Sequence, residues 1–542
     1  MPNEVSELDR LAVMRFYPTS GQIEVTREFP EETYLWNKDF HPTPVEKRNW
    51  GPWTYMAIWF GMVFVVPTWF LAGAGFSFGL NWYEILIDFF LGSLIIIVPT
   101  IIQSHGGARY GMSEPQLTRS RWGIYGAQLP SWIRAVISMG WWGIVSYIIT
   151  EAAVAMYVSA SGKLSLLQGA SPYSLAKSFP DIFWPVFVAV ILVQVLLFYV
   201  SPPVKAQPPL KMLARAAAPI VALGFAVLFV YTMTMAHWDF SPITSIPQSV
   251  RGGEFWINNL AYLNAVIADW ATMAVSMPDF TRFARSQRAQ TWGQVPMPFL
   301  MTMVAAIALM TTGATIALGL GGGKGISDPI ILAALELPGL LKFFVLAAFM
   351  LAMFVVNVFA NSIAPGYDIA NTYSKYLTWF RGIVIGVVIS AALGAWTFYA
   401  SGAYGFIYNW LLVYGALLGG VEGVLIFDYA VIRRFKFEAV DVYLSRGRFR
   451  YLKGFNPAAF IAFAFGTTVT YLWYWGWLRT PTTQFLYVNS WISAFLITGV
   501  LYVVLMVLWV IPKYQVFLIG DLKQGYMSAE VRKLFNPGSK KD

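Results

Sequence analysis

Long stretches without a charged side chain are the feature that most constrains how this chain can fold. A helix that spans a bilayer needs roughly 20 apolar residues. Uncharged stretches of that length occur at 49–83, 89–108, 182–204, 216–238, 289–323, 343–367, 454–478 and 480–512. Two further apolar runs, 135–162 and 255–278, each contain one acid, and the run 382–421 is broken by SGAYG at 401–405. A chain of this kind is expected to cross a membrane many times.

The apolar stretches together predict twelve spanning helices. They lie near 54–75, 83–105, 132–158, 182–201, 212–235, 255–277, 298–320, 341–363, 380–400, 405–431, 456–477 and 486–511. Composition agrees, because 57% of the residues are hydrophobic and 12% are charged, whereas soluble proteins carry about 25% charged residues. The segment 327–338 is too short to span and is expected to form a helix at the surface.

Most Lys and Arg residues fall on one side of the predicted bilayer. With the N-terminus inside, 31 of the 37 lie in inner segments and six in outer ones. Because basic residues collect in cytoplasmic loops, both termini are expected to be cytoplasmic. This distribution explains the net charge of +9 without a nucleic-acid partner. The polar first fifty residues predict no cleaved signal peptide, and a chain without cysteine has no disulfide or cysteine nucleophile.

Three acids lie deep within predicted spans: Glu151, Asp269 and Glu422. A charge at the centre of a spanning helix costs about 2.5–3.5 kcal/mol even on the lenient insertion scale. Such a carboxyl group persists where it faces a water-lined cavity or a partner, or where it stays protonated. Proton coupling is the functional interpretation, and a protonated carboxyl group bonded to a neighbouring helix is the structural one.

Two spans carry features that are unusual in the apolar interior. Gly61 and Pro67 lie in the middle of the first span, where proline removes a helix hydrogen bond and frees backbone carbonyls. Such a break is tolerated beside a cavity, although a packed kink is the alternative. Trp141 and Trp142 lie deep in the third span. Since tryptophan prefers the membrane interface, the pair indicates either helix packing or an aromatic platform for a ligand.

The eighth span carries two amides, Asn357 and Asn361, four residues apart and therefore on one helix face. An amide facing lipid is costly, so this face is expected to point into the protein. It serves either a ligand or hydrogen bonds between helices.

Five segments occur in an order that is typical of one transporter family. They are WNKDFHPTPVEKRNWGPW at 36–53, RWGIYGAQLPSWIRA at 121–135, PDFTRFAR at 278–285, NVFANSIAPGYDIAN at 357–371 and GVLIFDYAVIRR at 423–434. Together they resemble nucleobase–cation symporter family 1, which includes cytosine, uracil, allantoin and hydantoin permeases. The resemblance extends from about residue 36 to residue 512.

This resemblance implies an all-α integral membrane fold that is LeuT-like, with two inverted five-helix repeats and two further C-terminal helices. Substrate and cation would bind at mid-membrane beside broken first and sixth helices. The implied divisions are a cytoplasmic segment 1–50, the repeats 51–235 and 254–431, a basic loop 432–455, the last two spans 456–511 and a cytoplasmic tail 512–542. The sixth span has neither glycine nor proline in 255–277, so Asp269 is expected to hold backbone groups open there.

The resemblance also implies a substrate site. In a hydantoin-transporting member of the family, two tryptophans sandwich the flat ring of the substrate, and they align with Trp141 and Trp270. The family's asparagine for the edge of that ring aligns with Asn361, on the helix face that also carries Asn357. Its glutamine aligns with Val145, which offers no amide, so Ser146 or Asp269 is expected to compensate.

The cation site of sodium-coupled relatives aligns less well. Its backbone carbonyls align with Gly61, Phe64 and Ala352, but its two hydroxyl side chains align with Val355 and Val356. Sodium is a hard cation that needs oxygen ligands, so the resemblance predicts that the sodium site is lost. Proton coupling through Asp269, Glu151 or Glu422 is the natural replacement.

The expected function is import of a planar nitrogen heterocycle by a cell-membrane transporter that acts as a monomer in the lipid bilayer. No cofactor and no metal are expected. The alternative within transport is an amino-acid or amine carrier of the same architecture, with Asp269 binding the ammonium group. A membrane enzyme would need a catalytic constellation inside the spans, and the sequence offers no His cluster or Ser/His/Asp set there. A receptor or scaffold would not require acids in three separate spans.

Overall fold

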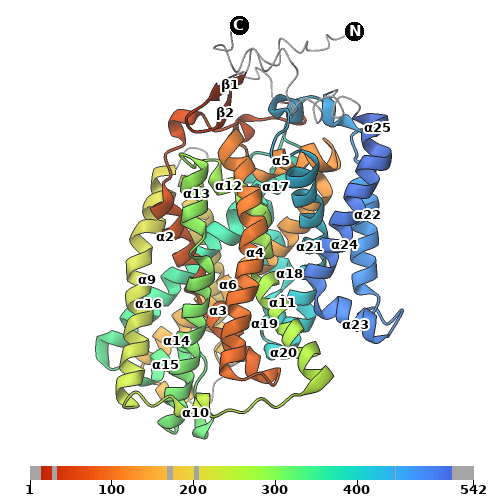
Figure 1. Ribbon diagram of the computed structural model, residues 1–542. Coiled ribbons are helices and arrows are strands. Elements are labelled where there is room, and N and C mark those ends of the chain that lie inside the picture. The colour runs from red at the N-terminus through yellow and green to blue at the C-terminus, as the bar shows by residue number, and fades with distance from the viewer. Residues whose placement is uncertain (1–13, 27–32, 168–174, 201–206, 446, 516–542) are drawn as a thin grey trace.

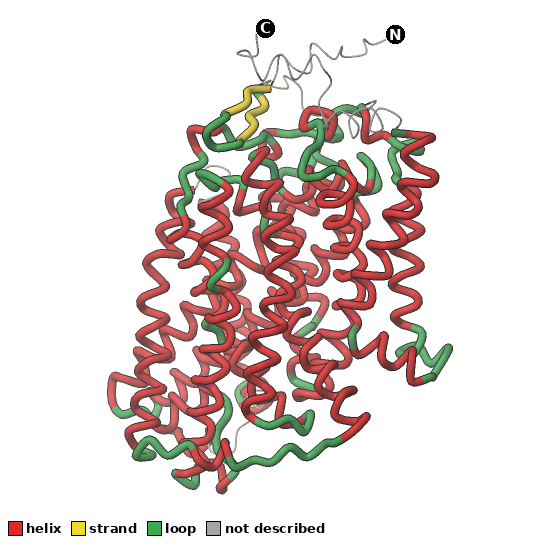
Figure 2. Tube along the Cα trace, in the orientation of Figure 1, coloured by secondary structure: helices red, strands yellow, loops and turns green. Residues whose placement is uncertain are grey.

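The computed structural model describes residues 14–26, 33–167, 175–200, 207–445 and 447–515. Within these ranges long helices run side by side to form an elongated bundle (Figure 1). A hairpin of β1 (Met14–Tyr17) and β2 (Gln22–Val25) lies at one end (Figure 2), an addition to the predicted all-α architecture. The predicted terminal segments 1–50 and 512–542 lie partly outside the described residues, at 1–13, 27–32 and 516–542.

The first half of the bundle runs from the first predicted span to the fifth. Its helices are α2 (Pro52–Val63), α3 (Val66–Ser77), α4 (Trp82–Tyr110), α5 (Glu114–Trp122), α6 (Gln128–Ala160), α7 (Leu175–Ser178), α8 (Pro180–Val200), α9 (Gln207–Met235) and α10 (Ser241–Thr244).

The second half contains the remaining predicted spans. Its helices are α11 (Gly252–Ser276), α12 (Pro278–Thr281), α13 (Gln287–Gln294), α14 (Met297–Ala317), α15 (Pro329–Glu336), α16 (Gly339–Val356), α17 (Ile363–Thr372), α18 (Trp379–Leu393), α19 (Trp396–Tyr399), α20 (Gly402–Phe406), α21 (Leu412–Ile426), α22 (Pro457–Tyr471), α23 (Pro481–Val488), α24 (Ser490–Leu505) and α25 (Ile511–Tyr514). Wider π-helical turns at Asn357–Ser362, Ile407–Leu411, Phe427–Ile432 and Met506–Val510 join several of them.

Ten of the predicted spans coincide with helices that are long and apolar enough to cross a membrane. In the described part of the chain there are nine such helices, and the pair α2 and α3 makes a tenth if it is one bent span. The sixth and eleventh predicted spans coincide with α11 and α22. The helix α22 has only 15 residues, and α11 carries Asn258, Asn259, Asn264 and Asp269, which make it more polar than the others.

The first span is interrupted, as its Gly61–Pro67 segment predicts. Helix α2 ends at Val63 and α3 begins at Val66, and their axes differ by 55°. Pro67 lies in the first turn of α3, where its missing N–H has no helical partner to lose. The extended backbone of Val65 leads into this turn. The break therefore lies within the span and not at its end.

The predicted interruption at Asp269 is wrong. Helix α11 continues from Gly252 to Ser276 without a break, and Asp269 lies inside it. The segment has no proline and no glycine beyond its first turn, so nothing in its backbone favours a break. The helix ends at Ser276, and Pro278 begins the short helix α12, where its missing N–H has no helical partner to lose.

The segment 327–338 forms a helix, α15, but its predicted place at the surface is wrong. Residues 329–334 are all buried, and α15 packs against α6 and α16. The Asp328 carboxylate caps the helix by accepting a hydrogen bond from the Ile330 N–H at 2.7 Å. Burial raises the pKa of Asp328 to about 6, partly opposed by these backbone hydrogen bonds. Because six consecutive residues are buried, α15 lies inside the protein and not at its surface.

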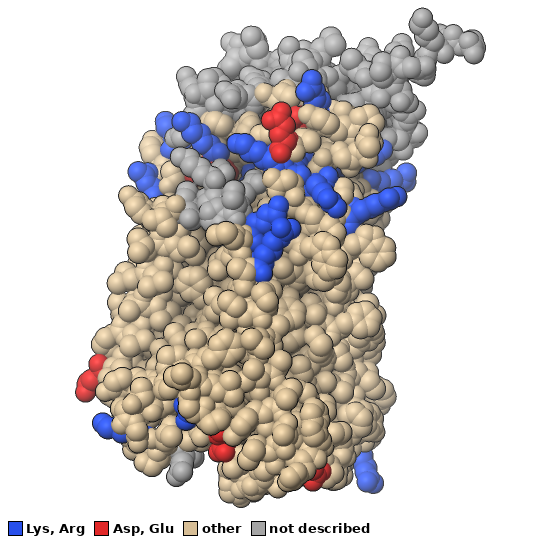
Figure 3. All heavy atoms as spheres, turned by 90° about the vertical axis from the view of Figure 1, so that its left-hand side faces the viewer, with Lys and Arg blue, Asp and Glu red and all other residues tan. Residues whose placement is uncertain are grey.

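Basic side chains gather at the end of the bundle that carries the hairpin (Figure 3). Just inside this end, a buried ion cluster joins four helices. Arg134 on α6 donates from Nε to Asp368 Oδ2 on α17 at 2.7 Å. Its Nη1 lies 3.2 Å from Asp279 Oδ2 on α12 and 3.4 Å from Glu114 Oε2 on α5.

Burial raises the pKa of Glu114 and of Asp279, and the neighbouring Arg134 guanidinium opposes this shift. All four side chains in the cluster are excluded from solvent. Breaking such a buried pair by removing one partner is strongly destabilising, since the remaining charge is left uncompensated. The cluster therefore holds these four helices together at this end.

Candidate functional site

A cavity lies at the middle of the bundle, between the broken first span and helices α6, α11 and α16 with its π-helical extension. The space inside it that a water-sized molecule can occupy is about 30 Å³, and all the empty space around it, including its open mouth, amounts to about 390 Å³. The lining is Met62, Val65, Pro67, Thr68, Trp141, Val145, Asp269, Trp270, Thr272, Met273, Val356, Ala360 and Asn361. Apolar and aromatic side chains thus surround a few polar groups.

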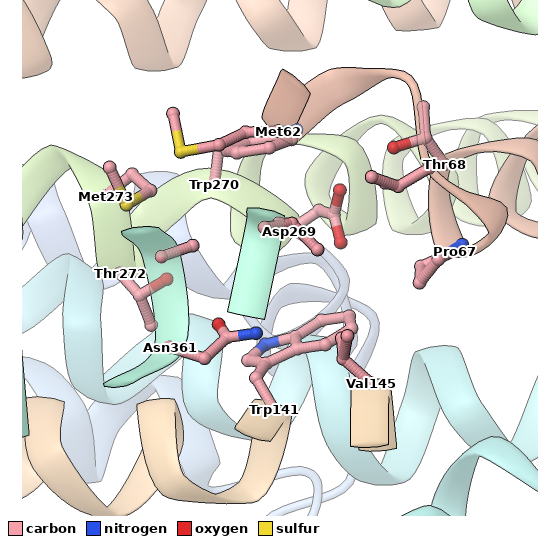
Figure 4. Close-up of a pocket in the computed structure, with 13 residues that line it drawn as sticks. Met62, Pro67, Thr68, Trp141, Val145, Asp269, Trp270, Thr272, Met273 and Asn361 are labelled. Carbon is pink, nitrogen blue, oxygen red and sulfur yellow. The ribbon is translucent and has the colours of Figure 1, made fainter. Parts of the chain in front are cut away.

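Two indole rings occupy opposite parts of this cavity. Figure 4 shows Trp270 from α11 above, Trp141 from α6 below, and the Asp269 carboxylate at a height between them. The Trp270 N–H points to Met301 Sδ at 3.2 Å. The Trp141 N–H donates to the Tyr414 hydroxyl at 3.2 Å. Both indole N–H groups are therefore used by the protein, which leaves the ring faces for a ligand.

Neighbouring aromatic and polar groups hold the two rings in place. Trp59 on α2 packs against Trp270 with the ring centres 5.3 Å apart. Tyr414 on α21, which accepts from Trp141, donates in turn to the backbone carbonyl of Ala268 at 3.0 Å. The Trp141 ring is thereby tied to the backbone of α11, one residue before Asp269.

The polar groups in the cavity are Asp269, Asn361, Thr68 and Thr272. No hydrogen bond to the Asp269 carboxylate comes from any residue that the structure describes. The Asn361 amide nitrogen donates to Asn357 Oδ1 at 3.0 Å. A carboxylate without a protein partner in a largely apolar cavity can bind a cation, a proton or a donor group of a ligand.

The structure brings Trp141, Trp270, Asp269, Asn361 and Val145 from the predicted site into the lining of one cavity. Ser146 and Asn357 do not line it. They are fully buried behind it, where the Asn357 amide donates to the Ser146 hydroxyl at 3.0 Å. Glu151 and Glu422 are also buried and also lie outside the lining. The helix α21 that carries Glu422 packs mainly against α24.

The positions aligned with a sodium site are filled with side-chain carbon. Gly61 on α2 faces Val355 on α16 so closely that a Cβ atom built on the glycine would lie 2.9 Å from Val355 Cγ1. Val355 and Ala352 are fully buried, and Phe64 and Val356 nearly so. Val355 therefore brings a methyl group, and no oxygen atom, against Gly61.

Two residues near the site were missed by the sequence analysis. Tyr414 on α21 holds the Trp141 N–H, and Gln194 on α8 hydrogen-bonds to both Trp142 and Asn357. Tyr414 gave no sequence signal, because it is one of many aromatic residues in the spans. Gln194 did give one, as an amide in an otherwise apolar span. Among the described residues, no group of three or more His, Asp or Glu side chains is placed to hold a metal ion.

The sequence is similar to those of known proteins over most of its length. The sequence profile of a family described as "Permease for cytosine/purines, uracil, thiamine, allantoin" matches residues 42–492. A purine-uracil permease of Arabidopsis thaliana is 31% identical over 435 residues, which cover 80% of this chain and 70% of that protein. An allantoin permease of Bacillus subtilis (strain 168) is 30% identical over 485 residues, with coverage of 87% and 93%.

The fold also matches a solved structure. Mhp1, a nucleobase-cation-symport-1 family transporter in a closed conformation with bromovinylhydantoin bound, superposes with a TM-score of 0.71. The match covers 92% of this chain and 99% of Mhp1, at 19% sequence identity. At that identity the likeness shows the fold alone.

Proposed function

Because the chain belongs to the family of permeases for cytosine/purines, uracil, thiamine and allantoin, we propose that it imports a planar nitrogen heterocycle by alternating access. It is a permease and not an enzyme. The observation that carries the substrate proposal is the cavity with an indole face on either side, both indole N–H groups being occupied by the protein. Aromatic faces attract flat ring systems.

The polar groups of the cavity support the same substrate class. A nucleobase, hydantoin or allantoin has apolar ring faces and a rim of N–H and C=O groups. Stacking between Trp141 and Trp270 would hold the faces, while Asn361, Asp269 and Thr272 lie where they can meet the rim. Val145 makes no polar contact, so recognition of the rim depends on these other groups.

The proposed architecture has twelve spans, with α11 and α22 as the sixth and eleventh, and two inverted five-helix repeats. Both termini are proposed to be cytoplasmic, because basic side chains gather at the end of the bundle that carries β1 and α25, the first and last elements that the structure describes. The bent first span beside the cavity is the natural place for a hinge, because the two halves α2 and α3 already differ in direction by 55°.

We also propose that transport is coupled to protons through Asp269. Its carboxylate lines the substrate cavity, whereas Glu151 and Glu422 do not. A group that gains and loses a proton must meet water in turn from each side, and the substrate cavity is the place that alternating access exposes in this way.

An amine or amino-acid carrier is the second candidate, because an unpartnered carboxylate in the cavity also suits an ammonium group. A binding screen separates the two. Purified protein would be heated with uracil, cytosine, allantoin, hydantoin or leucine at two pH values, and the shift in melting temperature measured. A heterocycle is expected to stabilise the protein while leucine does not. Stabilisation by leucine and by no heterocycle would overturn the proposed function.

A sodium gradient is expected to leave uptake unchanged. Val355 and Val356 replace the hydroxyl ligands, and Val355 Cγ1 lies against Gly61. Uptake of the substrate into proteoliposomes would be measured with sodium or with choline as the external cation, at equal pH. A saturable increase in the initial rate with sodium would contradict the prediction.

A further inference from the structure

An uncharged amide lies buried on α8, one helix away from the cavity. Gln194 is fully buried, and α8 has no other charged or amide side chain after Asp181 in its first turn. Burying an amide is costly unless its hydrogen bonds are satisfied. Both ends of the Gln194 amide are satisfied, by side chains of α6 and of the π-helical turn at Asn357–Ser362. The donor and acceptor of each hydrogen bond in this network can be assigned in turn.

The assignment starts at Trp142, because an indole N–H group can donate a hydrogen bond but cannot accept one. Trp142 Nε1 donates to Gln194 Oε1 at 2.6 Å. This fixes which end of the Gln194 amide is oxygen. Its nitrogen then points the other way and donates to the Ser146 hydroxyl at 3.2 Å.

The orientation of Gln194 determines that of Asn357. Gln194 Oε1 accepts a second hydrogen bond, from Asn357 Nδ2 at 3.0 Å. A flipped Asn357 would place its oxygen against the Gln194 oxygen, with no proton between them. Asn357 Nδ2 is thus held on the side of Gln194 and Ser146, and Asn357 Oδ1 is turned toward Asn361.

The last step reaches the cavity. Asn361 Nδ2 donates to Asn357 Oδ1 at 3.0 Å. Asn361 lines the cavity next to Trp141 (Figure 4), and no described residue donates to its Oδ1. The carbonyl end of Asn361 is therefore the part left to accept a hydrogen bond from a ligand.

We propose that Trp142 and Gln194 are positioning residues that determine specificity by fixing Asn361 as a hydrogen-bond acceptor. The substrate then has to present an N–H group, of a lactam, imide or amine, to that side of the cavity. A ring that carries only acceptors or alkyl groups there leaves the Asn361 carbonyl unpaired. This inference rests on the proposed function, since it concerns how the same site reads the rim of a heterocycle.

The test compares two ligands in two variants. Trp142→Phe keeps a ring but removes the donor that starts the sequence of bonds, and Gln194→Met removes the amide at similar length. Affinity is measured for whichever parent heterocycle binds in the screen, such as uracil or hydantoin, and for its N-methylated derivatives. Wild type is expected to prefer the parent by roughly tenfold over the derivative that blocks the critical N–H, the effect of leaving one buried acceptor unpaired. Either variant should reduce this preference at least severalfold.

Trp184→Phe is the matched control, because Trp184 lies on α8 and is 40% exposed at the outside of the bundle. The preference should be unchanged in that variant. A purely steric effect of the methyl group would persist in Trp142→Phe and Gln194→Met, and an unchanged preference in both would overturn the inference. The inference would also be overturned if both variants lost all binding at an unchanged melting temperature. Reorienting Asn361 leaves the two indole faces in place, so some binding should remain. If wild type binds no heterocycle, the proposed function itself fails.

Discussion

Replacing Trp270 with alanine is expected to weaken heterocycle binding by roughly 5- to 150-fold, since stacking of a base on an aromatic side chain contributes about 1–3 kcal/mol. The ring lines the cavity with its N–H already directed at Met301. The variant loses one of the two faces between which a flat ligand would lie. The dissociation constant would be measured by isothermal titration in detergent with the heterocycle that stabilises wild type most.

Trp256→Ala is the control for this substitution, because Trp256 lies at the outer part of the same helix and is 60% exposed. It should bind as wild type does. Trp270→Phe should recover part of the affinity, because a smaller ring still offers a face. If Trp270→Ala bound with undiminished affinity while remaining folded, the two indoles would not enclose the substrate.

Replacing Asp269 with asparagine is expected to abolish accumulation driven by a pH gradient. The asparagine amide has nearly the same shape as the aspartate carboxyl group, but it does not gain and lose a proton near neutral pH. Exchange of labelled for unlabelled substrate across the membrane needs no net proton movement, so it should continue. Proteoliposomes with an imposed pH gradient would give the accumulation, and equal pH on both sides would give the exchange.

Glu422→Gln is the matched control, because Glu422 is buried in α21 and does not line the cavity. It should accumulate substrate as wild type does. Accumulation that persisted in Asp269→Asn would place the coupling group elsewhere, and Glu151 on α6 would be tested next by the same measurement.

The positions of ten spans could be predicted from the gaps between charges, because a charged side chain is costly inside a bilayer. The break at Gly61–Pro67 followed from the missing N–H of proline. The expectation at Asp269 failed for the opposite reason. A carboxyl group does not disturb the helical backbone that carries it, and α11 remains continuous. A break in a helix requires a residue that changes the backbone itself, such as proline.

The surroundings of the site were harder to predict than its lining. A search for charges finds Glu151, Asp269 and Glu422 but not Gln194, although a buried amide needs partners just as they do. The contact of Gly61 with Val355 depends on how α2 and α16 pack, which two distant sequence positions do not reveal. The buried face of α15 likewise depends on what covers it.

The ion cluster around Arg134 lies largely on the same segments that line the cavity, about two helical turns further toward the basic end. Arg134 precedes Trp141 by seven residues on α6, Asp368 follows Asn361 by seven, and Asp279 follows Trp270 by nine. At about 1.5 Å per residue, the cluster lies roughly 10–13 Å beyond the cavity, toward the basic end. If a solute leaves in that direction, the buried side chains of this cluster have to separate and become hydrated. We therefore expect release on this side to require hydration of the cluster, and its rate to respond to osmotic stress more strongly than release across an apolar constriction would.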